Sequence, residues 1–151
     1  MIDATTPPLL FVWFRHPRLT TAEDHHRYIE IATELMEEKQ SYFALAVTHP
    51  KGEVISAEHR HIYTEWLENN HERIAEYGRC TFMVAESRIV RATARVVYWM
   101  SGRKLAVRFI PSMSDAIRSV MEFASRTGVE NLGEVETKLE ELRVFVDNYR
   151  P

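Results

Sequence analysis

The chain has 151 residues, of which 45% are hydrophobic and 27% charged, and this composition is that of one folded domain rather than a disordered segment. Its net charge of −3 lacks the basic excess that binding to nucleic-acid phosphates requires, so no nucleic-acid partner is expected. The single cysteine, Cys80, excludes an intramolecular disulfide and favours a reducing, cytoplasmic compartment.

The first strand and the first helix are predicted from an apolar run and a capping sequence. Residues 9–14 are continuously apolar, which is typical of a strand buried on both faces. This run is far shorter than a signal-peptide core or a membrane span, so no membrane insertion is expected. Thr20 and Glu23 have the spacing of a capping box, which predicts an amphipathic helix to about Gln40.

A second strand and a long second helix follow. The strand is predicted over Tyr42 to Thr48, and a turn sequence at residues 49–52 ends it. Ser56 is placed to N-cap a helix that runs to about Tyr77. Ser56 has a second interpretation as a phosphorylation site, because a phosphate at a helix N-terminus is electrostatically favoured.

The third strand, Cys80 to Ala85, leads into an arginine-rich helix that Gly102 is expected to end. At about 100° per residue, four of its side chains fall within an arc of about 80°. Arginine and tryptophan dominate interface hot spots, so this arc has the composition of a partner-binding surface, and the opposite side is expected to be buried. The arc consists of Arg88, Arg91, Arg95 and Trp99, and the opposite side of Ile89, Val90, Thr93, Val96, Val97 and Met100.

A fourth strand over Leu105 to Ile110, followed by a helix that Ser112 and Asp115 cap, completes an alternating pattern. This alternation predicts an α/β fold with a four-stranded, mostly parallel sheet and helices on its faces, over residues 1–127. In such sheets, binding sites lie beyond the carboxyl ends of the strands.

Residues 128–151 are predicted to form a C-terminal amphipathic helical extension. Its apolar residues are spaced 3, 4, 3, 4, 3, which is the spacing of a heptad seam. The seam is too short for an independent coiled coil, so it is expected to dock against the domain or against a second subunit. We call this set the C-terminal seam: Leu132, Val135, Leu139, Leu142, Val146 and Tyr149.

Motifs for catalysis, cofactors or metals are absent from the sequence. The five glycines form no phosphate-binding array, and no nucleophile elbow or H-E-x-x-H motif occurs among the residues. His59 shares a helical face with Trp66 and Tyr77, but no serine, threonine or carboxylate pairs with it by spacing. No enzymatic activity, cofactor or metal site is therefore predicted.

Several segments, taken in chain order, have a recognisable pattern: residues 11–14 with Leu19 and Thr20, residues 56–66, 81–85, 98–100, 107–109 and 114–116. Their order resembles that of bacterial STAS-like domains, the relatives of anti-sigma-factor antagonists, over about residues 9–126. The resemblance implies a non-enzymatic protein that binds protein partners, and in the antagonist branch a serine before the second long helix is phosphorylated. This chain lacks the Asp-Ser-Ser-Gly-type sequence at that place, so Ser56 is the nearest positional candidate.

Two functions are consistent with these observations. The first is a regulatory or scaffold protein, expected to be a homodimer, that binds an acidic protein surface through the Arg88, Arg91, Arg95 and Trp99 arc. The second is a binder of an apolar ligand or lipid in a cavity of the domain, which the many large side chains favour. The sequence leaves three alternatives for the arc itself. It is exposed to solvent, or it is covered by the acidic segment after Gly128, or it is buried between the two subunits of a dimer.

Overall fold

The computed structural model describes residues 2–6, 8–14, 22–48, 57–100 and 106–148. The residues expected to cap the first and second helices, Thr20 and Ser56, lie outside this part of the chain, as do Gly102 and Tyr149. The elements are β1 (Ile2–Thr6), β2 (Leu9–Phe14), α1 (Ala22–Glu37), β3 (Tyr42–Thr48), α2 (Ala57–Tyr77), β4 (Gly78–Val84), α3 (Arg88–Met100), β5 (Val107–Ile110), α4 (Met113–Arg126) and α5 (Leu132–Asn148).

The strands form a single sheet in the order β1-β2-β3-β4-β5. Strands β2 to β5 run parallel to one another, and β1 pairs antiparallel with β2 at one edge. The predicted α/β fold with four parallel strands and a C-terminal helix is confirmed. The edge strand β1 was not expected, because its sequence, IDATT, has no long apolar run.

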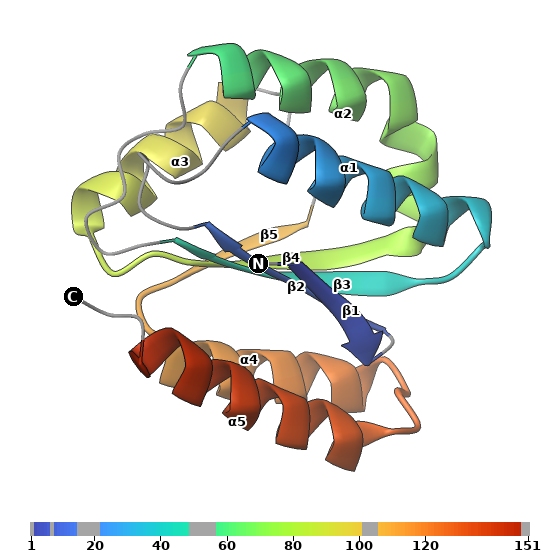
Figure 1. The fold of residues 1–151 in the computed structure, drawn as a ribbon, viewed down its shortest axis with the longest axis vertical. Helices are drawn as coiled ribbons and strands as arrows, with labels where there is room; N and C mark the ends of the chain where they lie inside the picture. The colour runs from blue at the N-terminus through green and yellow to red at the C-terminus, as the bar shows by residue number, and fades with distance from the viewer. Residues whose placement is uncertain (1, 7, 15–21, 49–56, 101–105, 149–151) are drawn as a thin grey trace.

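The strand order determines how the helices divide between the two faces. Each connection from β2 to β5 moves one strand further in the same direction, so right-handed crossovers place α1, α2 and α3 on the same face. Helices α4 and α5 follow β5 and cover the opposite face (Figure 1). At the carboxyl ends of the neighbouring strands β4 and β5, the chain therefore continues to opposite faces of the sheet, to α3 after β4 and to α4 after β5.

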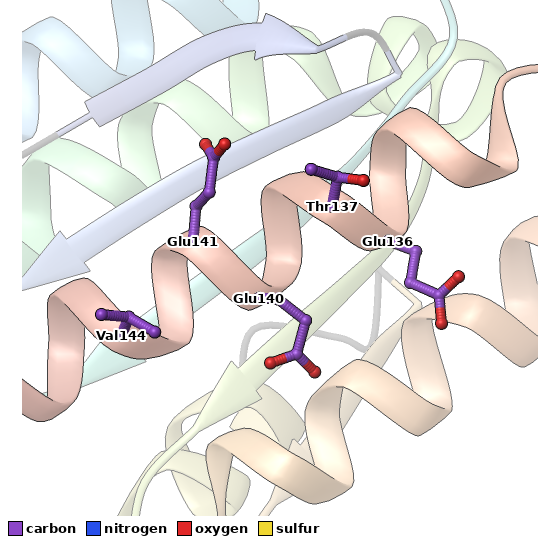
Figure 2. A pocket seen from close by; sticks show the side chains of 5 residues that line it. All are labelled: Glu136, Thr137, Glu140, Glu141 and Val144. Carbon is purple, nitrogen blue, oxygen red and sulfur yellow. The ribbon is translucent and has the colours of Figure 1, made fainter.

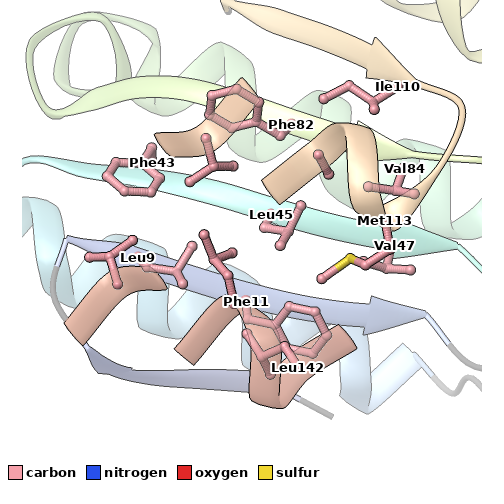
Figure 3. Close-up of a cluster of buried hydrophobic side chains, with 14 of the residues drawn as sticks. Leu9, Phe11, Phe43, Leu45, Val47, Phe82, Val84, Ile110, Met113 and Leu142 are labelled. Atoms are coloured by element: carbon pink, nitrogen blue, oxygen red, sulfur yellow. The ribbon is translucent and has the colours of Figure 1, made fainter. Parts of the chain in front are cut away.

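Side chains alternate along the strands and fill a separate apolar core on each face. In β2, Leu9 and Phe11 point to the α4 and α5 side, whereas Leu10 and Val12 point to the α1 and α2 side. Phe43 and Phe82 lie in the larger core (Figure 3), and each packs edge to face on the other and on the partly buried Phe123, at centroid separations of 5.6–6.3 Å. Other buried members of the larger core include Leu45, Val47, Val84, Ile110, Met113, Ala116, Val120 and Ala124.

The C-terminal seam belongs to this larger core. Val135, Leu139, Leu142 and Val146 are buried in it, and Leu132 packs against it from the side. Of the two partners expected for the seam, the structure therefore places it against its own domain. The inward face of α5 is buried by this packing, so only its outer face can contact another molecule.

The first turn of α4 is capped as its sequence predicts. The Ser112 hydroxyl accepts a hydrogen bond from the Asp115 backbone N–H at 3.1 Å and donates one to the Asp115 carboxylate at 2.7 Å. Substituting Ser112→Ala is expected to lower the free energy of unfolding by about 1 kcal/mol, because an N-terminal N–H loses its acceptor. Chemical denaturation measures this, with the exposed neighbour Ser114→Ala as a control that stays within about 0.5 kcal/mol.

Candidate functional site

Helix α3 is joined to the end of β4 by side-chain contacts to the backbone. The Ser87 hydroxyl accepts from the Val90 N–H at 3.4 Å, as an N-cap does. The Arg91 guanidinium donates to the carbonyl oxygens of Ala85 and Glu86, the latter at 2.8 Å. Arg91, one of the four residues of the predicted arc, is therefore bonded to the backbone that follows β4, and these bonds join α3 to the end of that strand.

The inner side of α3 contacts β5, the edge strand. The ring of Tyr98 packs edge to face on Phe109 with centroids 6.1 Å apart. The guanidinium carbon of Arg95 lies 5.7 Å from the centre of the same Phe109 ring, within the range of a cation–π contact. These contacts fix which side of α3 faces outward, although Arg95 itself remains exposed.

The outer side of α3 carries large apolar side chains that are open to solvent. Ile89 is 76% exposed, Val96 56% and Trp99 63%. The prediction that Ile89 and Val96 are buried is wrong, because α3 packs through the side that holds Arg91, Ala94 and Tyr98. Val90 is half-buried, and the side chains of Thr93, Val97 and Met100 lie outside the described part of the structure.

Basic residues border this apolar strip. Arg88 and Arg95 are exposed on the same side of the helix, Ala92 is exposed between them, and none of the 13 residues of α3 is acidic. Ile89, Ala92, Val96 and Trp99 are spaced 3, 4, 3, which puts them on one face of a helix. We call this set, with Arg88 and Arg95, the α3 docking face.

The acidic C-terminal segment, as far as it is described, does not cover the α3 docking face. Helix α5 packs on the opposite side of the sheet from α3 (Figure 1), and its inward residues contact α4 and the sheet. Of the three states left open for the arc, cover of Trp99 by the segment after Gly128 of the same chain is therefore contradicted for that segment as far as Asn148. Sequence periodicity could show that α5 is amphipathic, but it does not specify which face of the sheet the helix covers.

The outer side of α5 is acidic. Glu136, Thr137, Glu140, Glu141 and Val144 line a shallow, open hollow, and we call this set the acidic α5 face (Figure 2). Figure 2 shows Glu136 and Glu140 pointing to one side of the helix and Glu141 to the other. Val144, 52% exposed, is the apolar member of the set.

A buried polar contact between α1 and α2 was not predicted. His25 is buried, and its Nδ1 lies 2.8 Å from the hydroxyl oxygen of Tyr63, with the two rings edge to face. Nearby, the indole N–H of Trp66 donates to the Thr33 hydroxyl at 3.0 Å. The helical periodicity of α1 puts His25 on the same side as Tyr28, which is the signal that could have identified it.

Tyrosines around this contact are held in their neutral form. Burial raises the pKa of Tyr28 to about 12. Burial, and secondarily the neighbouring Tyr28, also raises the pKa of Tyr42 and of Tyr63 well above the ordinary value. None of these hydroxyls is therefore activated as a base or nucleophile near neutral pH, and the cluster serves the packing of α1 and α2 on the sheet.

The structure describes the remaining candidate residues only in part. Burial raises the pKa of the Cys80 thiol, against a smaller opposite effect of Arg108, so the unreactive thiol form is favoured. Ser56 lies outside the described residues, and so does the side chain of His59. Trp66, Phe82 and Phe109, which favoured an apolar-ligand cavity, contact other side chains.

Comparison with known proteins adds no further information about the site. Within the described ranges, no group of three or more histidines, cysteines or carboxylates is placed to hold a metal ion. The helices, as far as their residues are described, include none with the length and apolar character to cross a membrane. No family model, curated protein or solved structure matches the chain.

Proposed function

We propose that this chain is a non-enzymatic regulatory or scaffold protein of STAS-like type that binds an acidic protein surface through the α3 docking face. The observation that carries the proposal is the exposure of Ile89, Val96 and Trp99 side by side on one helix. Exposed apolar groups that adjoin one another and have a polar rim mark interaction sites, whereas scattered single ones do not.

The chemistry of the partner follows from the rim. Arg88 and Arg95 give the α3 docking face a positive border without any acidic residue on the helix, so a surface with carboxylates around an apolar centre is complementary to it. Trp99 and the arginines are the residue types that contribute most to binding energy at interfaces. A cytoplasmic location belongs to the same proposal and is supported by the lone, buried Cys80.

The proposal is tested by affinity capture with the full chain as bait and quantitative mass spectrometry. The test variant is Arg88→Glu with Arg95→Glu, which reverses the rim and leaves Arg91, the backbone anchor, in place. Bound partner is expected to fall about tenfold or more, since both contacts become repulsive. Partner retention should also decrease as salt is added, because the exposed charges are screened.

The matched control is Arg27→Glu with Arg79→Glu, which changes the net charge equally at exposed arginines of α1 and β4. Partner retained by the wild type and by this control, but lost from the α3 variant, supports the proposal. Equal retention by both double variants, or equal loss from both, would show that the α3 docking face is not the binding surface.

A further inference from the structure

We infer that the partner bound by the α3 docking face is a second copy of this chain, held through its acidic α5 face, so that copies join head to tail. The inference rests on the proposed function and names the partner of that same surface. Three properties of the described residues support it: the distribution of exposed apolar side chains, the charges around them, and the layers in which they lie.

Exposed apolar side chains occur on these two faces. Among the residues whose side chains the structure describes, four large apolar ones are exposed. Ile89, Val96 and Trp99 belong to the α3 docking face, and Val144 belongs to the acidic α5 face. An interface between the two would therefore remove all four from water, which is favourable in proportion to the apolar area covered.

The charges around the two apolar centres are opposite. Arg88 and Arg95 border the α3 docking face, whereas three glutamates line the acidic α5 face. Two of these carboxylates contact cations of their own helix, Glu140 with Arg143 at 2.7 Å and Glu141 with Lys138 at 3.7 Å. Such solvent-exposed pairs contribute little, so an incoming arginine can share or replace them.

The layers exclude the alternative ways of joining these faces. Helices α3 and α5 lie on opposite faces of the sheet (Figure 1), so one copy cannot bring its own two surfaces together. For the same reason, two copies cannot form both α3-to-α5 contacts with each other at once. A symmetric pairing of α3 with α3 is disfavoured by charge, because it would bring the arginines of the two copies close together. The contact is heterologous, and it continues into a chain or closes into a ring rather than stopping at the predicted homodimer.

The size of the surfaces sets the strength expected of this contact. Helix α3 has 13 residues and is about 20 Å long, so a single helix face buries less than the roughly 800 Å² per partner of a standard stable interface. Association is therefore expected to be weak and to increase with concentration, and added salt should oppose it.

The test is sedimentation equilibrium of the purified full chain from about 10 µM to about 1 mM, a range that reports weak association. Two variants each block one surface while keeping residues that form helices well. The first, Arg95→Ala with Trp99→Ala, blocks the α3 docking face. The second, Glu136→Ala with Glu140→Ala and Val144→Ala, blocks the acidic α5 face. Circular dichroism confirms that both remain folded.

The inference predicts that the mean mass of the wild type rises with concentration beyond that of a dimer. Each blocked variant alone should associate about tenfold more weakly, or stay monomeric. An equimolar mixture of the two should form a 1:1 pair that grows no further, because one copy keeps only its α3 docking face and the other only its acidic α5 face.

Two outcomes overturn the inference. A wild type that stays monomeric to about 1 mM contradicts self-association; if its affinity capture still depends on Arg88 and Arg95, the proposed function stands with a different partner. A dimer that the α5 substitutions leave intact shows a symmetric α3 contact instead. Loss of both self-association and arginine-dependent capture removes the proposed function as well.

Discussion

Substituting Leu139→Ala is expected to lower the free energy of unfolding by about 2–5 kcal/mol. Leu139 is fully buried where α5 meets α4 and the sheet, so the change removes its apolar contacts and leaves a cavity in the larger core. A domain of this kind has a stability of about 5–15 kcal/mol, so one side chain accounts for a large part of it. Urea denaturation followed by circular dichroism measures the loss.

The matched control for Leu139 lies five residues further along the same helix. Val144 is 52% exposed, and Val144→Ala is expected to change the free energy of unfolding by no more than about 0.5 kcal/mol. If the two substitutions had equal effects, α5 would not be docked through the C-terminal seam. That result would also remove the assignment of inner and outer faces on which the acidic α5 face depends.

The second large effect is a loss of stability in alkali. The pKa of Tyr28 is raised to about 12 in the folded chain, and the pKa values of Tyr42 and Tyr63 are raised in the same direction. Above pH 10 the unfolded chain therefore releases protons that the folded chain still holds, so stability decreases as pH rises. Tyr28 alone contributes a decrease of about 1.4 kcal/mol per pH unit between about pH 10 and 12.

Urea midpoints measured at pH 8, 10, 11 and 12 test this dependence. Tyr42 and Tyr63 add to the slope of Tyr28, so a decrease of several kcal/mol is expected by pH 12. Tyr63→Phe removes one ionisable hydroxyl and should make the decrease shallower, whatever it does to stability at pH 8. A free energy of unfolding that is constant between pH 9 and 12 would contradict the burial of this tyrosine cluster.

Much of the fold could be predicted because period and polarity repeat along the buried elements. The apolar runs that begin at Leu9 and Tyr42 form strands in which residues 9–12 and 42–47 are buried, and the described part of the C-terminal seam has the spacing that its packing requires. Strand β1 escaped prediction because a short strand at a sheet edge needs no apolar run. The division of helices between layers depends on the strand order, which no local pattern encodes.

The exposed side of α3 could be predicted from the sequence only in part. Apolar residues occupy most of the circumference of α3, so periodicity alone could not say which side meets the sheet. The interaction of Tyr98 with Phe109 and the bonds of Arg91 to the backbone decide it. As a result Arg88, Arg95 and Trp99 lie on the exposed side together with Ile89 and Val96, whereas Arg91 is half-buried and bonded to the backbone after β4.

The most direct measurement of whether the α3 docking face binds a protein is photo-crosslinking from its centre. A benzophenone amino acid replaces Ala92, which is exposed between Arg88 and Val96, and in the control it replaces Ala75, an exposed alanine of α2. We expect a protein adduct from position 92 that is absent from position 75 and is lost when Arg88 and Arg95 become glutamate. Equal adduct yields from the two positions, or a yield from position 92 that survives the charge reversal, would contradict the central claim.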